Sequence, residues 1–252
     1  MEIAEHIAAL REDGDRMAAA IAAVGASAPI PTCPEWTMRD LVLHTGEVHR
    51  WATAHVTGTA GEPGADDQDF VGPLPDDAEL SAWFLQGHGG LVNALTNAPP
   101  DLECWTFLKA PSPLAFWARR QCHETSIHRA DAESASRAIT PLVPSVGADG
   151  IDELLMCFVT RPKSRLRADT ERSLAVRTSD TNDVWVVRFS DHVETTHEDG
   201  DDNGNGADCT IQGTASDLNL FLWNRIDRDA LRVEGDQSVL DTWRSSVTIR
   251  WS

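Results

Sequence analysis

The sequence predicts a four-helix bundle, residues 1–143, followed by a smaller α+β sheet domain, residues 144–252. In the first half, apolar residues recur at the spacing of amphipathic helices, with Pro- and Gly-rich segments between them. Beyond Pro141 and Pro144 the pattern changes to the alternation that is typical of half-buried strands. A chain of 252 residues can form two domains of ordinary size, each with its own core.

The first two helices have clear starts and ends in the sequence. Helical spacing of apolar residues predicts a helix over residues 2–24, which Gly25 ends. Thr37 stands at an N-cap position with Asp40 three residues later, so a second helix should begin near Met38. Its inward stripe, up to an end near Gly58, consists of Leu41, His44, Val48, Trp51 and His55.

Two more helices are predicted on either side of a Pro-rich loop at residues 99–113. The third covers residues 78–97, although three glycines weaken its pattern, and it follows a Gly-, Pro- and Asp-rich loop at 58–77. The fourth should run from Leu114 to Ala138. One side of this fourth helix carries Trp117, Gln121, Glu124, His128 and Asp131.

The second domain should combine helices with strands. Helices are predicted at 148–160, 215–225 and 238–245. Alternating segments predict strands at 173–178, 184–189, 192–197, 208–212 and 247–251, with the acidic, Gly-rich run 198–205 as a hairpin loop.

Composition argues against several classes of partner. Lys and Arg number 21 against 40 acidic residues, and at a net charge of −19 neither nucleic acid nor an anionic membrane surface is expected to bind. The chain begins without a leader-like segment, and no run of about eighteen apolar residues occurs. Its five cysteines lack a C-x-x-C pair, which indicates neither a disulfide framework nor a thiolate zinc site. We therefore expect a cytoplasmic protein; the oligomeric state is left open.

Glu124 and His128 have the spacing of metal ligands. They are four residues apart on the fourth predicted helix, so both side chains project from one face. A carboxylate and an imidazole in this arrangement can hold one divalent ion but leave it under-coordinated. The best third ligand is His44, on the inward stripe of the second helix.

Helical geometry sets the other histidines aside as ligands. At about 100° per residue, His49 points about 140° away from the inward stripe. His55 lies on that stripe but about 16 Å further along, at a rise of about 1.5 Å per residue. His123 is off the face that carries the ligand pair, and His88, among glycines, is interpreted as a core residue.

The same residues have a simpler structural interpretation. An inward histidine is usually a satisfied core residue, and E-x-x-x-H spacing occurs by chance in many helices. A core-facing Glu124 is harder to explain in this way, because an unpaired buried carboxylate needs a cation or strong hydrogen-bond donors. Asp131 is likewise either an acceptor that orients His128 or a solvated neighbour of Arg129.

Two segments resemble a known family. Residues 32–44, TCPEWTMRDLVLH, and residues 123–133, HETSIHRADAE, resemble the mycothiol-dependent maleylpyruvate isomerase family, within the DinB-like metal-binding bundles. A weaker similarity joins residues 222–225, LWNR, and 233–236, VEGD, to the small carboxy-terminal domain of that family. The resemblance thus covers most of the chain and implies an actinobacterial source.

The resemblance implies a metal site and a thiol cofactor. A His, Glu, His set holds a divalent ion in that family, usually taken as zinc, and the matching positions are His44, Glu124 and His128. Three protein ligands leave one open position, as in catalytic zinc sites. Mycothiol would occupy it as a thiolate, whose addition to a double bond allows rotation before elimination. The matching activity-associated arginine is Arg225, although an arginine at a helix end is more often a capping residue.

The borrowed thiol agrees with the placement of the cysteines. Cys122 is on roughly the opposite side of its helix from Glu124, and the other cysteines have positions typical of small core or loop residues. We therefore expect a metal- and mycothiol-dependent isomerase or S-transferase that acts on a small electrophilic substrate. The alternatives are a non-catalytic metal- and thiol-binding protein and a thiol-independent metal hydrolase.

Overall fold

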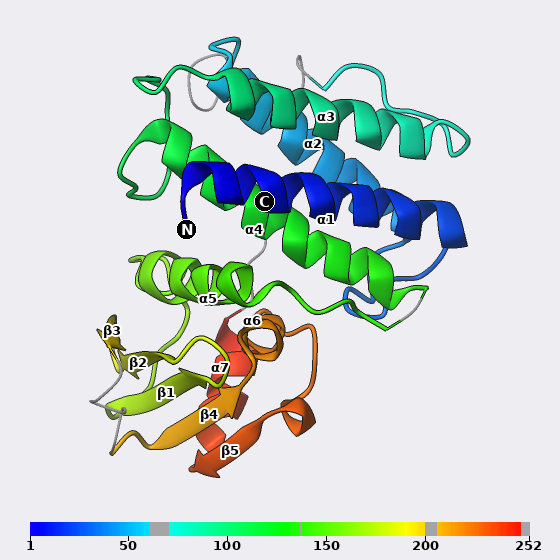
Figure 1. Cartoon of the computed structure of the whole chain (residues 1–252). Helices are drawn as coiled ribbons and strands as arrows, with labels where there is room; N and C mark the ends of the chain where they lie inside the picture. The colour runs from blue at the N-terminus through cyan, green and yellow to red at the C-terminus, as the bar shows by residue number, and fades with distance from the viewer. Residues whose placement is uncertain (61–70, 137, 200–205, 248–252) are drawn as a thin grey trace. The chain divides into compact units, whose positions relative to one another are not determined.

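The computed structural model describes residues 1–60, 71–136, 138–199 and 206–247. The chain divides into two compact units, Met1–Thr140 and Pro141–Ser252 (Figure 1). Within the described residues, no helix is both long enough and apolar enough to cross a membrane.

The first unit is the predicted four-helix bundle. Its helices are α1 (Ile3–Val24), α2 (Met38–Val56), α3 (Leu80–Asn97) and α4 (Pro113–Ser134). Helix α1 packs mainly against α4 and α3, and α2 packs against α3 and α4. Figure 1 shows these four long helices lying alongside one another.

Local chemistry sets the ends of these helices. Gly25, at φ 81°, ends α1 as predicted. Thr37 and Asp40 form the predicted capping box of α2, in which the Thr37 amide donates to Asp40 Oδ2 at 2.8 Å. Helix α4 stops four residues before its predicted end, where the Ser134 hydroxyl donates to the carbonyl of Asp131 and competes with the helical pattern.

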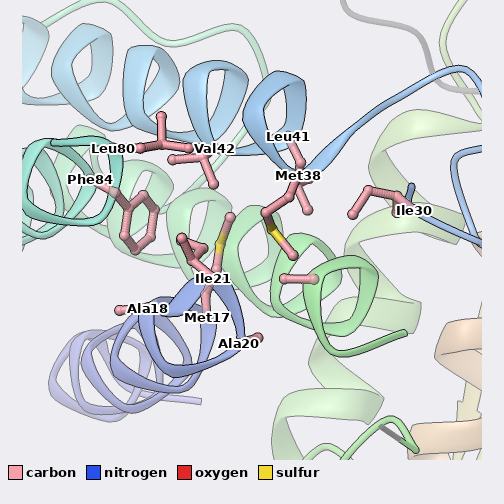
Figure 2. Close-up of a cluster of buried hydrophobic side chains, with 11 residues drawn as sticks. Met17, Ala18, Ala20, Ile21, Ile30, Met38, Leu41, Val42, Leu80 and Phe84 are labelled. Atoms are coloured by element: carbon pink, nitrogen blue, oxygen red, sulfur yellow. The ribbon is translucent and has the colours of Figure 1, made fainter. Parts of the chain in front are cut away.

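One hydrophobic cluster joins α1, the start of α2 and the start of α3. Figure 2 shows Met17 and Ile21 of α1 facing Met38, Leu41 and the rest of the cluster. The other labelled members are Ala18, Ala20, Ile30, Val42, Leu80 and Phe84. Because most of these side chains have no exposed surface, the cluster fixes the first two turns of α2 against the bundle.

The second unit is a mixed five-stranded sheet with helices. Its strands are β1 (Arg172–Thr178), β2 (Asp183–Phe189), β3 (Val193–Asp199), β4 (Cys209–Gly213) and β5 (Arg232–Gly235), in the order β3-β2-β1-β4-β5. Strands β1 and β4 run parallel, and the remaining pairs are antiparallel. Its helices are α5 (Pro144–Asp152), the π-helix η1 (Glu153–Phe158), α6 (Ala215–Leu222), the 3-10 turn η2 (Arg228–Ala230) and α7 (Ser238–Ser246).

Most elements predicted for the second unit are confirmed, with four corrections. Residues 198 and 199, predicted as the start of the hairpin loop, are the last residues of β3. The helix predicted at 148–160 begins at Pro144, since proline is favourable at a first helical position. Helix α6 ends at Leu222 rather than 225, because Asn224 adopts a left-handed conformation at φ 62°. Strand β5 was not predicted, since four residues are too short to show alternation. Residues 200–205 of the predicted hairpin loop, 61–70 of the loop at 58–77, and 248–251 of the predicted last strand lie outside the described residues.

The contact between Gly14 and His88 gives a test of bundle packing. A Cβ at Gly14 would meet the imidazole of His88, which is 3% exposed and has little room to move. We expect Gly14→Ala to lower the free energy of unfolding by about 1–2 kcal/mol, because overpacking outweighs the gain in helix propensity. Gly89→Ala, on open α3 surface, should instead be neutral or stabilising by up to about 1 kcal/mol. Urea denaturation of both variants checks this, and a Gly14→Ala protein as stable as Gly89→Ala would contradict it.

Candidate metal centre

The three predicted ligands, His44, Glu124 and His128, converge in the first unit. Glu124 Oε1 lies 3.2 Å from His128 Nε2 and 3.4 Å from His44 Nε2. The three ligand atoms all lie within 4.8 Å of one another. The structure therefore brings together the three residues that the sequence analysis selected. His44 of α2 faces Glu124 and His128 of α4.

The helices explain this convergence. Glu124 and His128 are one turn apart on α4, and His44 lies in the second turn of α2, which packs against α4. The capping box and the buried Met38 and Leu41 fix the start of α2. The His44 and His128 rings meet edge to face, with centroids 5.0 Å apart.

Glu124 is a buried carboxylate that remains charged. Burial alone would raise its pKa, but the adjacent imidazoles of His128 and His44 and the charge of Arg120 lower that pKa well below its usual value. The Arg120 guanidinium donates to Oε2 at 2.9 Å, which leaves Oε1 facing the two imidazoles. One oxygen of Glu124 is thus held by the protein and the other faces the site.

His128 is held in place from behind. Its Nδ1 lies 3.0 Å from Asp131 Oδ2, and the other oxygen of Asp131 accepts from the Thr32 hydroxyl at 2.6 Å. Asp131 has no exposed surface, so it is an acceptor that orients His128 and not a solvated neighbour of Arg129. Burial disfavours the charged ring, but Asp131 and Glu124 outweigh it and raise the pKa of His128 to about 9.

The buried Nε2 of His44 lies 3.4 Å from Glu124 Oε1 but makes no hydrogen bond of good geometry within the described part of the chain. A buried polar atom without a partner is costly, unless a ligand supplies one. The Trp36 ring packs on both imidazoles, 5.0 Å from His44 and 6.1 Å from His128 by ring centroids. Two imidazole nitrogens and one carboxylate oxygen fit a divalent ion such as zinc, with at least one coordination position open.

The structure agrees with the predicted placement of His88 and His55 but not with that of His49. His88 is a core residue as predicted, and His55 packs among Trp51, Trp105 and Trp117, away from the centre. The expectation that His49 points away from the interior is wrong: it has no exposed surface.

The burial of His49 follows from how α2 is covered. Its Nε2 lies 2.8 Å from the Thr125 hydroxyl of α4, and its ring contacts Phe84 of α3. Since α3 and α4 cover adjacent sides of α2, the buried face is centred near His49, and His44 lies on the edge of that face toward α4. Burial lowers the pKa of His49 well below its usual value, so this imidazole is neutral.

Three residues around the centre were not predicted: Arg120, Thr32 and Trp36. Arg120 could have been found, because it stands four residues before Glu124, at the spacing of a helical ion pair. Thr32 is separated from Asp131 by 99 residues, and no local pattern signals such a contact. Trp36 belongs to the quoted motif 32–44, but its contact with the imidazoles was not predicted.

The three-ligand cluster of the first unit includes neither Arg225 nor a cysteine. Arg225 follows α6 in the second unit, where its guanidinium donates to the carbonyl of Trp223 at 2.7 Å. None of the five cysteines forms a disulfide. Among the described residues, no cysteine joins a cluster with metal-ligand geometry.

Comparison with known proteins places the chain in a family. The model of the mycothiol maleylpyruvate isomerase N-terminal domain matches residues 7–133, and the model described as the MDMPI C-terminal domain matches residues 145–242. The chain belongs to the mycothiol-dependent maleylpyruvate isomerase family. The resemblance stated from the two motifs is thereby confirmed.

Solved structures of this family share the fold. A crystal structure of the mycothiol-dependent maleylpyruvate isomerase covers 93% of this chain and 93% of its own, at 13% identity and a TM-score of 0.60. A histidine-to-alanine variant of that isomerase matches with the same coverage and identity, at a TM-score of 0.62. No curated protein matches the sequence.

The electrostatics of this family member's centre predict an unusual histidine titration. In the metal-free protein, His128 should stay protonated up to about pH 9. Its folded pKa exceeds the unfolded value of about 6.5, so its contribution to stability is fully present below pH 6.5 and is lost as the pH rises through about 9. Asp131→Asn should lower this pKa toward 6.5, because it removes the negative charge of the carboxylate that faces His128 Nδ1.

An NMR titration of the imidazole signals measures this pKa. Asp15→Asn is the control, since it removes the same charge from an exposed position of α1. Titration of wild-type His128 near pH 6.5, or no response to Asp131→Asn, would show that Asp131 does not hold the ring.

Proposed function

We propose that this chain is a metal-dependent enzyme that uses mycothiol to isomerise a small electrophile or to transfer the thiol to it. The observation that carries the proposal is the convergence of His44, Glu124 and His128, whose ligand atoms all lie within 4.8 Å of one another. Membership of a mycothiol-dependent family supports the thiol. The described cysteines are dispersed and none belongs to the ligand cluster, which supports an external thiol over one from the chain.

The surrounding residues suit such a centre. When bound at His44, Glu124 and His128, a divalent ion, which we take to be zinc, would keep a thiol as thiolate at neutral pH. Arg120 holds the second oxygen of Glu124, so the charged carboxylate presents its first oxygen to the site. Asp131 fixes the ring of His128 so that Nε2 points at the same place.

Several parts of the proposal rest on general chemistry. A cytoplasmic location agrees with the reduced cysteines and the acidic composition. Arg225 is proposed as an activity-associated residue only from its match to the family motif. Maleylpyruvate is one substrate to test, since one scaffold can serve many electrophiles.

His44→Ala tests the metal centre. We expect the variant to bind zinc more weakly by about 100-fold or more, since losing a direct ligand costs more than losing an outer partner. Zinc content after purification and competition with a chelator measure this. His192→Ala, an exposed histidine of the second unit, should retain wild-type zinc content. Undiminished zinc in His44→Ala would remove the basis of the proposed mechanism.

Thiol dependence tests the reaction class. Zinc-loaded protein should convert one or more electrophiles, among them maleylpyruvate, only when mycothiol is added. Glu124→Gln should lower the turnover by about 100-fold or more, because the site loses its anionic ligand. Liquid chromatography of substrate and product over a panel of unsaturated acids and other electrophiles measures this.

Two outcomes would contradict this reaction class. Turnover without added thiol would indicate a metal hydrolase. Binding of mycothiol without turnover of any electrophile would indicate a thiol-binding protein.

A further inference from the structure

The second unit has a small polar cavity on one face of its sheet. Its volume is about 150 Å³, and its lining comes from three adjacent strands, β1, β4 and β5. The lining residues are Arg177, Thr210, Gln212, Arg232 and Glu234.

The strand register explains why these side chains meet. Arg177 pairs with Gln212, which pairs with Arg232, so the three form one row across the sheet. Neighbouring strands are about 4.8 Å apart, which places the two arginine backbones roughly 10 Å apart with Gln212 between them. Thr210 and Glu234 form the next row on the same face, two residues along each strand.

The opposite face of β4 belongs to the hydrophobic core. Cys209 and Ile211, which alternate with Thr210 and Gln212, have no exposed surface. The packed sheet therefore fixes the backbone positions of the polar residues, while the side chains of Arg232 and Glu234 at the sheet edge are exposed. Sites built on such rigid elements keep their geometry better than sites on loops.

The lining has the charge and hydrogen-bonding groups of an oxyanion site. Two guanidinium groups and one carboxylate give it a net charge of +1, in a chain whose net charge is −19. The planar fork of arginine binds carboxylate and phosphate groups with two parallel hydrogen bonds. The Gln212 amide and the Thr210 hydroxyl add neutral donors. Glu234 pairs with Arg232 at 2.6 Å, so it competes with an incoming anion for that guanidinium.

We propose that this cavity binds a small oxyanion, through a carboxylate or phosphate group held by Arg177, Gln212 and Arg232. A cavity of about 150 Å³ accommodates a molecule of about the size of benzene. The ligand is therefore a small organic acid or phosphate, with its charged group between the two arginines. All lining residues of this site belong to the second unit, and its binding does not depend on the proposed reaction.

NMR titration of the full chain tests the site with two probes, inorganic phosphate and succinate, at low ionic strength. The amide signals of Gln212 and its neighbours should shift in a saturable manner with at least one probe, and the more tightly bound probe identifies the charged group. Arg177→Gln should weaken binding about tenfold or more, because it removes a charge-assisted hydrogen-bond donor. Higher salt should weaken binding to the wild type.

Two further variants separate specific binding from general charge effects. Arg188→Gln removes the same charge from an exposed position of β2 outside the cavity, and should leave affinity within about twofold. Glu234→Gln should tighten binding about twofold to fivefold, because it frees Arg232 from its ion pair.

Three results would overturn the site. They are the absence of saturable shifts with both probes, equal losses in Arg177→Gln and Arg188→Gln, and unchanged or weaker affinity in Glu234→Gln. Each would identify this face as an ordinary solvated polar surface. Because the Glu234 variant changes an exposed residue and predicts a gain, the proposal stays testable even if Arg177→Gln fails to fold.

Discussion

A buried negative charge, the carboxylate of Glu124, is the constraint around which the first unit is arranged. A carboxylate that is 3% exposed must be compensated, or it would be protonated or expelled. Arg120 compensates one oxygen, and His128 and His44 face the other. Because these three partners come from two helices, they tie the position of α2 to that of α4. In the described part of the chain, only Oε2 has a partner with a permanent positive charge, the guanidinium of Arg120.

Helix α4 carries a second polar network, in which the buried charged groups are paired with one another. On α4, Arg129 donates to Glu133 at 2.9 Å and to Asp13 of α1 at 3.2 Å, and Glu133 accepts from the Thr140 amide at 2.7 Å. Ser126 also donates to Asp13. These groups satisfy one another, which is the expected state of a structural network. The Glu124 network instead brings ligand atoms of His44, Glu124 and His128 within 4.8 Å of one another, and this convergence distinguishes the candidate metal centre from the structural network.

Local rules predicted the fold and the three residues that converge at the candidate metal centre, but they did not predict the contacts across the bundle. The spacing of Glu124 and His128 and the stripe of His44 follow from helical period alone. His49 was misplaced because a single apolar stripe was assumed, whereas α3 and α4 together bury a wider face of α2. Thr32 could not be predicted as the partner of Asp131, since 99 residues separate them. In the second unit, the strand pairing that joins Arg177 to Arg232 through β4 depends on a parallel register that no sequence pattern encodes.

The position of His44 depends on the rotational phase of helix α2. Each residue turns a helix by about 100°, so a shift of one residue in the phase of α2 would present Leu43 or Thr45 to Glu124 in place of the imidazole. The phase is set at the helix start, where the Thr37 capping box fixes the first residue and the buried Met38 fixes the first turn. Trp36, one residue before the cap, then packs on the two imidazoles. The segment that begins the helix therefore also builds the wall of the centre, which is why the helix-start motif and the ligand motif occur as one continuous stretch of sequence.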